Sequence, residues 1–481
     1  MSIKLPDRPV SSRIPTSVLV AAWAAAVVLA AGCLIWALLM PGGAGNESAS
    51  NAAPTLAIKP TATKPAATAV ARTGLAAVGT QAPNAGTPSG KVPSPTVAPT
   101  PTTGKPGATA AGNAPTATKL PINETFGYGI QVNGFDDPDG SIAMTKQLGM
   151  TWIKQQVVWG SLEHEKGNVD WSGLDRIVRK ANKADLKIML SVVTAPTWSH
   201  PAIGADPKDD PNGIKAPPDD PNAYANFVAQ VVQREKDLGY PVHAVEVWNE
   251  QNLMREWRTS PQKIDAARYI QMLTATYKRV KAIDPNIVVI SGALSPTGVD
   301  NGVDAVDDLK YLQQMVNYGL VSNADCIGVH HNGINLPPDV PYQDAPKNAK
   351  AAKATFRGPF DNPHHSWSFY TTLNETARIV NKQKPLCITE FGWPSSVGIS
   401  TPVRDGFGFA GDNTLQEQAD YIVKAFALMK QWGFVKLAFL WNLNFNTVTS
   451  DPTTTDNAIY SILTAGGTQR PAFDALGKMP K

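Results

Sequence analysis

Cysteine is scarce in this 481-residue sequence, with three residues in all. Cys33 lies in an apolar N-terminal run, and Cys326 and Cys387 lie in apolar runs that resemble strands. Cysteine in such a run is by default a small buried hydrophobe. A disulfide between Cys326 and Cys387 is an alternative, but their spacing does not support it. No cluster of Cys and His has the spacing of a metal site, so we predict no metal.

The sequence also lacks an excess of charge of one sign. It has 43 basic and 40 acidic residues, which give a formal net charge of +3, and no run of basic residues occurs after residue 121. A nucleic-acid partner usually requires concentrated positive charge. We therefore predict no nucleic-acid partner.

Aromatic residues are absent from residues 41–121, which contain thirteen prolines and many Ala, Thr, Gly and Ser. A segment without large apolar side chains cannot bury a core, and it stays extended and solvated. Its Pro-Thr content is typical of a stiffened tether. Residues 41–121 are thus predicted to be a disordered linker.

Charged residues are absent from residues 18–40, an apolar run of 23 residues. At about 1.5 Å of rise per residue, a helix of this length spans a hydrocarbon core of roughly 30 Å. Basic residues precede the run within residues 1–17, and the next one is Lys59. This asymmetry predicts a cytoplasmic N-terminus and a membrane anchor, with everything after residue 40 outside the cytoplasm.

Two alternatives to the anchor remain open. A cleaved signal peptide would make the protein secreted, although its apolar region is usually about 7 to 15 residues long. Processing at Cys33 would make it a lipoprotein, although the apolar run continues beyond Cys33 to Met40. The favoured prediction is a single-pass protein of the cell membrane with its catalytic domain outside.

Residues 122–481 alternate strand-like apolar runs with helical stretches, which is typical of parallel β/α folds. Helical patterns lie between the strand-like runs, and another at residues 470–478 follows the last of them. We expect one closed (β/α)8 TIM barrel, with a doubly wound open sheet as the alternative. The expected strands are residues 126–132, 151–158, 186–193, 242–248, 287–293, 325–331, 385–390 and 435–441.

Two of these strands end in a glutamate set among aromatic residues. Residues 245–250 read Val-Glu-Val-Trp-Asn-Glu, and residues 386–394 read Leu-Cys-Ile-Thr-Glu-Phe-Gly-Trp-Pro. Carboxylates just past the carboxyl ends of barrel strands lie where such barrels build active sites. Two facing carboxylates are the minimum needed to break a glycosidic bond. Glu250 and Glu390 are therefore the candidate catalytic pair.

With these motifs the chain resembles the retaining glycoside hydrolases of clan A, including the family 5 cellulase-like and family 39 xylosidase-like enzymes. The resemblance covers roughly residues 125–480. In those enzymes an Asn-Glu pair follows the fourth strand and a Glu follows the seventh. The resemblance therefore implies that Glu250 is the acid/base, that Asn249 binds the sugar 2-hydroxyl and that Glu390 is the nucleophile.

Four tryptophans at or just beyond strand ends are candidates for binding a carbohydrate substrate. Aromatic rings match the apolar faces of sugars. For Trp198 a packing role is the alternative. For Trp441 the resemblance implies that the ring forms the floor of the subsite that holds the cleaved sugar. These residues are Trp159, Trp198, Trp393 and Trp441.

Two positions depart from the clan A pattern. Many relatives carry Arg on the second strand beside the nucleophile, whereas this chain has Lys154, which lacks the bidentate fork of a guanidinium. The sixth strand often ends in His with a nearby Tyr, whereas this chain reads His330-His331-Asn332. His330 can still hydrogen-bond near the nucleophile. The His pair hardly indicates a metal, because adjacent strand residues point to opposite faces.

The resemblance also implies a mechanism. Protonated Glu250 would donate to the leaving oxygen while Glu390 attacks the anomeric carbon, and water would resolve the glycosyl-enzyme. This predicts a raised pKa for Glu250 and carboxyl groups about 5 to 5.5 Å apart. No cofactor is expected, and the substrate is a β-linked poly- or oligosaccharide. A non-catalytic glycan-binding surface protein and an envelope scaffold are the alternatives.

Overall fold

The structure is a computed structural model, and it describes residues 126–203, 215–350, 364–399, 402–404, 406–448 and 456–481. The predicted cytoplasmic segment 1–17, membrane segment 18–40 and linker 41–121 lie outside the described residues. Within the described part of the chain, no helix is both long and apolar enough to cross a membrane.

Eight parallel strands form one sheet in the order β5-β4-β3-β2-β1-β8-β7-β6. Each strand matches a predicted one to within two residues at either end. Nearly all positions of these strands are buried, as expected of strands covered on both faces. The strands are β1 Gly127–Gln131, β2 Trp152–Val158, β3 Lys187–Val193, β4 Ala244–Val247, β5 Val288–Ser291, β6 Ile327–Asn332, β7 Leu386–Gly392 and β8 Val435–Leu440.

The sheet closes on itself between β5 and β6. Ile290 pairs with Cys326 and Leu294 pairs with Val329 in parallel bridges. The backbone N–H of Ser291 donates to the carbonyl of Cys326 at 3.1 Å. This closure confirms the predicted (β/α)8 barrel and excludes an open doubly wound sheet.

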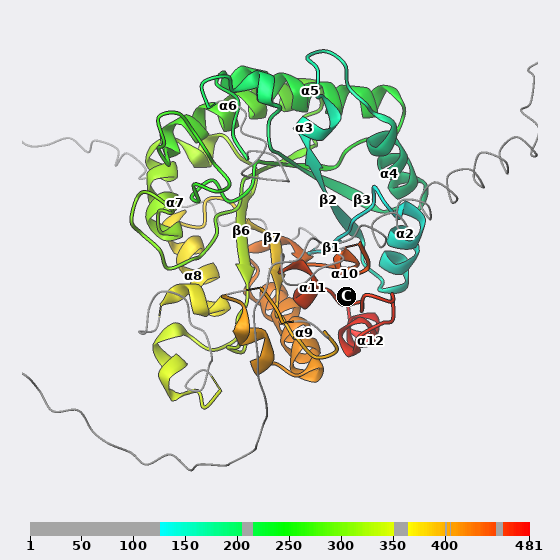
Figure 1. The fold of residues 1–481 in the computed structure, drawn as a ribbon, viewed down its shortest axis with the longest axis vertical. Coiled ribbons are helices and arrows are strands. Elements are labelled where there is room, and N and C mark those ends of the chain that lie inside the picture. Colours follow the sequence, from blue (N-terminus) through cyan, green and yellow to red (C-terminus); the bar gives the residue numbers. More distant parts are fainter. Residues whose placement is uncertain (1–125, 204–214, 351–363, 400–401, 405, 449–455) are drawn as a thin grey trace, which may run out of the picture. The chain divides into compact units, whose positions relative to one another are not determined.

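An outer ring of helices surrounds the strands (Figure 1). Several helices begin at a side-chain cap that the sequence specifies; Thr414, for example, forms a capping box with Glu417. The long helices of the described residues are α2 Pro138–Gln147, α4 Ser172–Lys183, α5 Pro221–Asp237, α6 Ala266–Ile283, α7 Asp308–Asn317, α8 Phe369–Ile379, α9 Leu415–Trp432 and α12 Pro471–Lys478.

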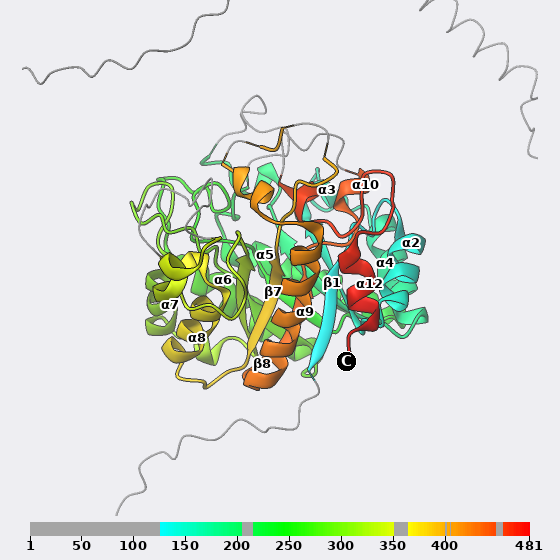
Figure 2. The same ribbon diagram turned by 90° about the horizontal axis from the view of Figure 1, so that it is seen from below.

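Short helices decorate the connections that follow the carboxyl ends of the strands. They include α3 Trp159–Leu162 after β2, and α10 Phe445–Val448 and α11 Asn457–Tyr460 after β8. In the side view, α3 and α10 lie at one end of the barrel, and the C-terminus lies toward the other (Figure 2). The sequence did not predict these short helices.

The barrel interior is built in layers of inward side chains. An apolar layer consists of Trp152, Met189, Ala244, Ile290, Cys326, Cys387, Leu437 and Phe439. Two residues further along four of the strands, the inward side chains are polar and fully buried; they are Lys154, Ser191, Glu246 and Thr389. The carboxyl half of the barrel is therefore lined by polar groups rather than by a continued apolar core.

The apolar layer contains a disulfide between Cys326 and Cys387. The expectation of two unpaired buried cysteines is therefore wrong. The two residues are separated by 61 positions, which carries no pairing signal, and it is the adjacency of β6 and β7 that brings them together. This disulfide ties two neighbouring strands below the polar layer.

Candidate active site

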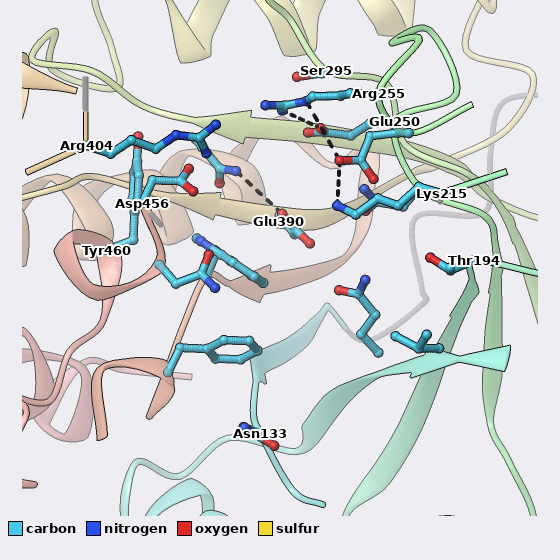
Figure 3. A pocket seen from close by; sticks show the side chains of 18 of the residues that line it. Asn133, Thr194, Lys215, Glu250, Arg255, Ser295, Glu390, Arg404, Asp456 and Tyr460 are labelled. Atoms are coloured by element: carbon cyan, nitrogen blue, oxygen red, sulfur yellow. Dashed lines mark hydrogen bonds and ion pairs between the residues drawn. The ribbon is translucent and has the colours of Figure 1, made fainter. Parts of the chain in front are cut away.

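An open cleft of about 1340 Å³ lies at the carboxyl ends of the strands. Glu250 and Glu390 both line this cleft, and Figure 3 shows their side chains on the same wall. Asn249 and Trp441 also line it. Active sites of (β/α)8 barrels lie at this face, so the cleft is the candidate site.

A distorted turn after β4 positions Glu250. Trp248 has a φ of 76° and Glu250 a φ of 47°, both in the left-handed region that residues other than glycine rarely adopt. The backbone N–H of Glu250 donates to the carbonyl of Ala293 at 2.8 Å, which fixes the turn. Non-glycine residues in this conformation cluster at functional sites, where the surrounding structure holds them.

Glu390 lies within β7 and is bound from two sides. Lys154 Nζ donates to its Oε1 at 2.9 Å, and Asn332 Nδ2 donates to its Oε2 at 3.5 Å. Asn332 supplies a donor at the end of β6, where the clan pattern led us to expect a tyrosine. Only 6% of Glu390 is exposed, so both interactions act in a largely dry environment.

His330 joins the two glutamates. Its Nδ1 lies 3.2 Å from Glu250 Oε1 and 3.6 Å from Glu390 Oε2. The neighbouring His331 points to the other side of β6 and packs edge-to-face on Phe369. The two histidines therefore point to opposite faces of the strand, as predicted.

Glu246 is a fully buried carboxylate that the sequence reading did not single out. Its Oε2 lies 3.3 Å from Lys154 Nζ, and its Oε1 lies 3.9 Å from His330 Nε2. Lys154 Nζ also donates to the carbonyl of Thr389 at 3.2 Å. The three N–H groups of this ammonium thus face Glu246, Glu390 and a backbone oxygen.

The charges of this network stabilise one another. Burial alone would lower the pKa of Lys154, but the carboxylates of Glu246 and Glu390 raise it above its ordinary value. Burial would raise the pKa of Glu246, but Lys154 and His330 lower it. Lys154 is therefore a buried cation between two carboxylates, and Glu246 is an anion at neutral pH.

Arg255 reaches Glu250 from the rim of the cleft, which the sequence reading missed. Its Nη2 lies 3.3 Å from Glu250 Oε2, and its Nε lies 3.7 Å from Glu256 Oε1. Lys215 Nζ also contacts Glu256 Oε1, at 2.9 Å (Figure 3). These residues form a mixed-charge wall next to Glu250.

The expected raised pKa of Glu250 is not found. Burial would raise it, but the hydrogen bond and positive charge of His330, together with Arg255, lower it to about 2. The pKa of His330 is raised, because the charge of Glu390 and the bond to Glu250 outweigh burial. Both shifts favour an ion pair of Glu250 and His330, and the two groups titrate together. The sequence showed neither contact.

Two of the predicted sugar-binding tryptophans, Trp159 and Trp393, lie in the protein interior. The indole N–H of Trp159 donates to Glu163 Oε2 at 2.7 Å, and that of Trp393 donates to the Leu336 carbonyl at 2.8 Å. Trp198 packs edge-to-face on Trp159. A substrate-binding role for Trp159 and Trp393 is corrected to a packing role, because both rings are fully buried. Trp198 is partly buried, and its role stays a prediction. Strand-end position does not decide which way a ring turns.

The positions of the two glutamates match those of clan A glycoside hydrolases, after the fourth and at the end of the seventh strand. With the barrel, they make this chain similar to the glycoside hydrolases of clan A. Residues 131–333 match the family model described as glycosyl hydrolase family 53.

The chain is also similar to several solved structures. The chain is similar to a family 39 glycoside hydrolase from Bacteroides cellulosilyticus WH2, with a TM-score of 0.50, 18% identity and coverage of 74% of this chain and 63% of that chain. It thus spans less than two thirds of that protein. It is also similar to a family 39 β-xylosidase from Caulobacter crescentus, with a TM-score of 0.46 and 18% identity; the match covers 73% of this chain and 70% of that chain. For a fungal β-1,4-galactanase the TM-score is 0.47 and the identity is 14%; the match covers 73% of this chain and 99% of that chain. No curated protein matches the chain.

Proposed function

We propose that the chain is a retaining glycosidase that hydrolyses a β-linked poly- or oligosaccharide. Glu250 serves as acid/base, Glu390 as nucleophile, and Asn249 binds the 2-hydroxyl of the sugar whose bond is cleaved. The observation that carries this proposal is the convergence of Glu250 Oε1 and Glu390 Oε2 on His330 Nδ1, at 3.2 and 3.6 Å.

This convergence favours retention of configuration. The two carboxylate oxygens cannot be farther apart than the sum of their distances to the shared nitrogen. This upper limit on the separation of the two oxygens excludes most of the roughly 6.5 to 9.5 Å range of inverting enzymes, which must fit a water between the carboxyl groups. A pair held by one imidazole suits direct attack by Glu390 on the anomeric carbon.

The hydrogen bond between His330 and Glu250 supplies the acid. A carboxylate that is ionised in the free site cannot protonate a leaving group by itself. His330 Nδ1 passes its proton to Glu250 as Glu250 donates to the glycosidic oxygen, and the proton returns when Glu250 activates the incoming water. Lys154 compensates the negative charge of Glu390 throughout.

The cleft suits a substrate of several sugar units. Its volume of about 1340 Å³ exceeds the roughly 300 to 1,000 Å³ of pockets for single small ligands. Trp441, which is 8% exposed, packs on Phe445 at 4.9 Å between ring centroids, and both line the cleft. Trp441 would form the apolar floor beneath the sugar next to Glu390.

We further propose that the enzyme acts outside the cytoplasm. The apolar run at residues 18–40 would anchor it in the cell membrane, and residues 41–121 would hold the barrel away from the bilayer. This location fits a polymeric substrate, which does not cross membranes.

Chemical rescue tests the two roles. Glu250→Ala should lose roughly 10² to 10⁴-fold in turnover of an unactivated aryl glycoside. On a substrate with a good leaving group, azide should restore it and give a glycosyl azide of retained configuration. Glu390→Ala with azide should give the inverted product.

The control is Glu165→Gln, at an exposed glutamate, which should keep wild-type turnover. If Glu390→Ala gave the retained azide, the two roles would be exchanged. Full activity in both alanine variants would show that other residues carry the reaction. No turnover by the wild type would instead support a protein that binds glycans without cleaving them.

A further inference from the structure

A second cluster of chemically active side chains lies at the same face of the barrel, outside the candidate active site. Asp307 precedes α7, and His364 and His365 lie in the 3₁₀ turn before α8. One ligand atom from each of the three side chains lies within 4.8 Å of the other two. Each side chain is only partly buried, so an ion can reach the cluster from solvent.

Asp307 lies at similar distances from the two histidines. Asp307 Oδ2 lies 3.5 Å from His364 Nε2 and 3.6 Å from His365 Nε2. These separations are long for hydrogen bonds. A tetrahedral ion with ligands at about 2.1 Å holds those ligands roughly 3.4 Å apart, which is close to both values.

We propose that Asp307, His364 and His365 form a structural binding site for a divalent transition metal of the zinc type. Imidazole and carboxylate ligands in this number suit Zn²⁺ and its neighbours better than Mg²⁺ or Ca²⁺, which prefer oxygen ligands alone. Water takes the fourth position.

Neighbouring groups orient the three ligands. Asp307 uses Oδ1 to accept the N–H of Lys310 at 3.1 Å, and this helix cap leaves Oδ2 directed at the two imidazoles. The backbone N–H of Ser366 donates to His364 Nδ1 at 3.2 Å, and Ser366 Oγ lies 2.9 Å from the same nitrogen. These contacts hold the His364 ring with Nε2 facing Asp307 Oδ2.

A second carboxylate balances the charge of the ion. Asp308 is almost fully buried, and its Oδ1 lies 2.6 Å from His365 Nε2. The metal replaces the proton of that nitrogen, and this proton leaves to solvent. The two negative charges of Asp307 and Asp308 then balance the +2 charge of the ion. This balance offsets the repulsion between the ion and the positive N-terminal end of α7.

The site would tie two connections of the active-site face together. Asp307 ends the connection from β5, and the histidines lie in the connection from β6. Ser366 and Trp367, which follow the histidines directly, line the cleft. The metal therefore stabilises one wall of the cleft and takes no part in bond cleavage.

The test is titration of the chelator-treated full chain with ZnCl₂, followed by calorimetry and thermal unfolding. We expect one equivalent of Zn²⁺ per chain and a higher Tm, with no comparable effect of MgCl₂. His364→Ala and Asp307→Ser should each weaken binding at least tenfold. Serine is chosen because it keeps the cap of α7.

The matched control is His164→Ala, which removes an exposed histidine elsewhere on the barrel and should bind Zn²⁺ like the wild type. Zinc binding that survives unchanged in both cluster variants would overturn the proposal. So would the absence of binding by the wild-type chain, which would make the cluster a set of ion pairs only.

Discussion

Lys154 is the residue on which the charge balance of the candidate site depends. Its ammonium is fully buried and contacts two carboxylates, at 2.9 and 3.3 Å. A buried ion pair adds little stability over an apolar replacement of both partners, but removing one partner strands the other charge. The role of this lysine is therefore to permit two glutamates in the interior.

Lys154→Met should lower the free energy of unfolding by about 3 to 5 kcal/mol, because Glu246 and Glu390 lose their counter-charge. Urea unfolding measures this loss. Lys310→Met is the control; it breaks an exposed pair with Asp300 and should cost no more than about 1 kcal/mol. A Lys154→Met protein as stable as the control would contradict the network described above.

The pH dependence of stability should reveal the ionised state of Glu250. Because its pKa falls from 4.5 to about 2 on folding, its contribution is fully present above pH 4.5 and is lost as the pH falls from 4.5 toward 2. The stability advantage of wild type over Glu250→Gln should shrink across that window in urea unfolding. An advantage that is constant from pH 6 to pH 2 would disprove the lowered pKa.

At the residue scale, sequence reasoning found the groups that end strands but not those that act from elsewhere. Glu250, Glu390 and Lys154 were predictable because motif and strand position coincide. Glu246 lies in the same string as Glu250, yet nothing in the string shows that it points inward at Lys154. Arg255 lies in a loop, where no periodicity indicates direction.

The elements themselves follow closely from the sequence. Apolar runs determine the strands locally, and each strand was predicted to within two residues. The left-handed turn at Trp248 and Glu250 was not predictable, since tertiary contacts impose it against local preference. The same holds for the disulfide, which depends on how β6 and β7 pair.

Replacing both cysteines of that disulfide should destabilise the barrel without removing activity. Cys326→Ala/Cys387→Ala should lower the free energy of unfolding by about 2 to 4 kcal/mol, since the bridge closes a long loop. Turnover per folded molecule should stay near that of wild type, because the bridge lies below the polar layer. Urea unfolding without reductant and an aryl glycoside assay check both points. Unchanged stability would contradict a stabilising bridge.

The whole molecule combines this barrel with an N-terminal quarter of different composition. Residues 41–121 have no aromatic side chains, and residues 18–40 have no charge. Composition alone predicts what these segments do. Their arrangement in the cell envelope stays a prediction.

The full chain should fractionate with membranes and resist extraction by alkaline carbonate, because 23 uncharged residues can span the bilayer. A chain that begins at residue 122 should be soluble and keep full glycosidase activity. A mature N-terminus beyond residue 40 would show a cleaved signal peptide instead. A lipid on Cys33 would replace the anchor with a lipoprotein.

The stereochemistry of hydrolysis tests the central claim most directly. Proton NMR should follow the first minutes of cleavage of the β-glycoside that the enzyme hydrolyses fastest. If Glu390 forms a glycosyl-enzyme and Glu250 activates the water, the β-anomer must appear first, and the α-anomer must follow only by mutarotation. First appearance of the α-anomer would contradict the two-glutamate retaining mechanism, even if Glu250 and Glu390 both proved essential.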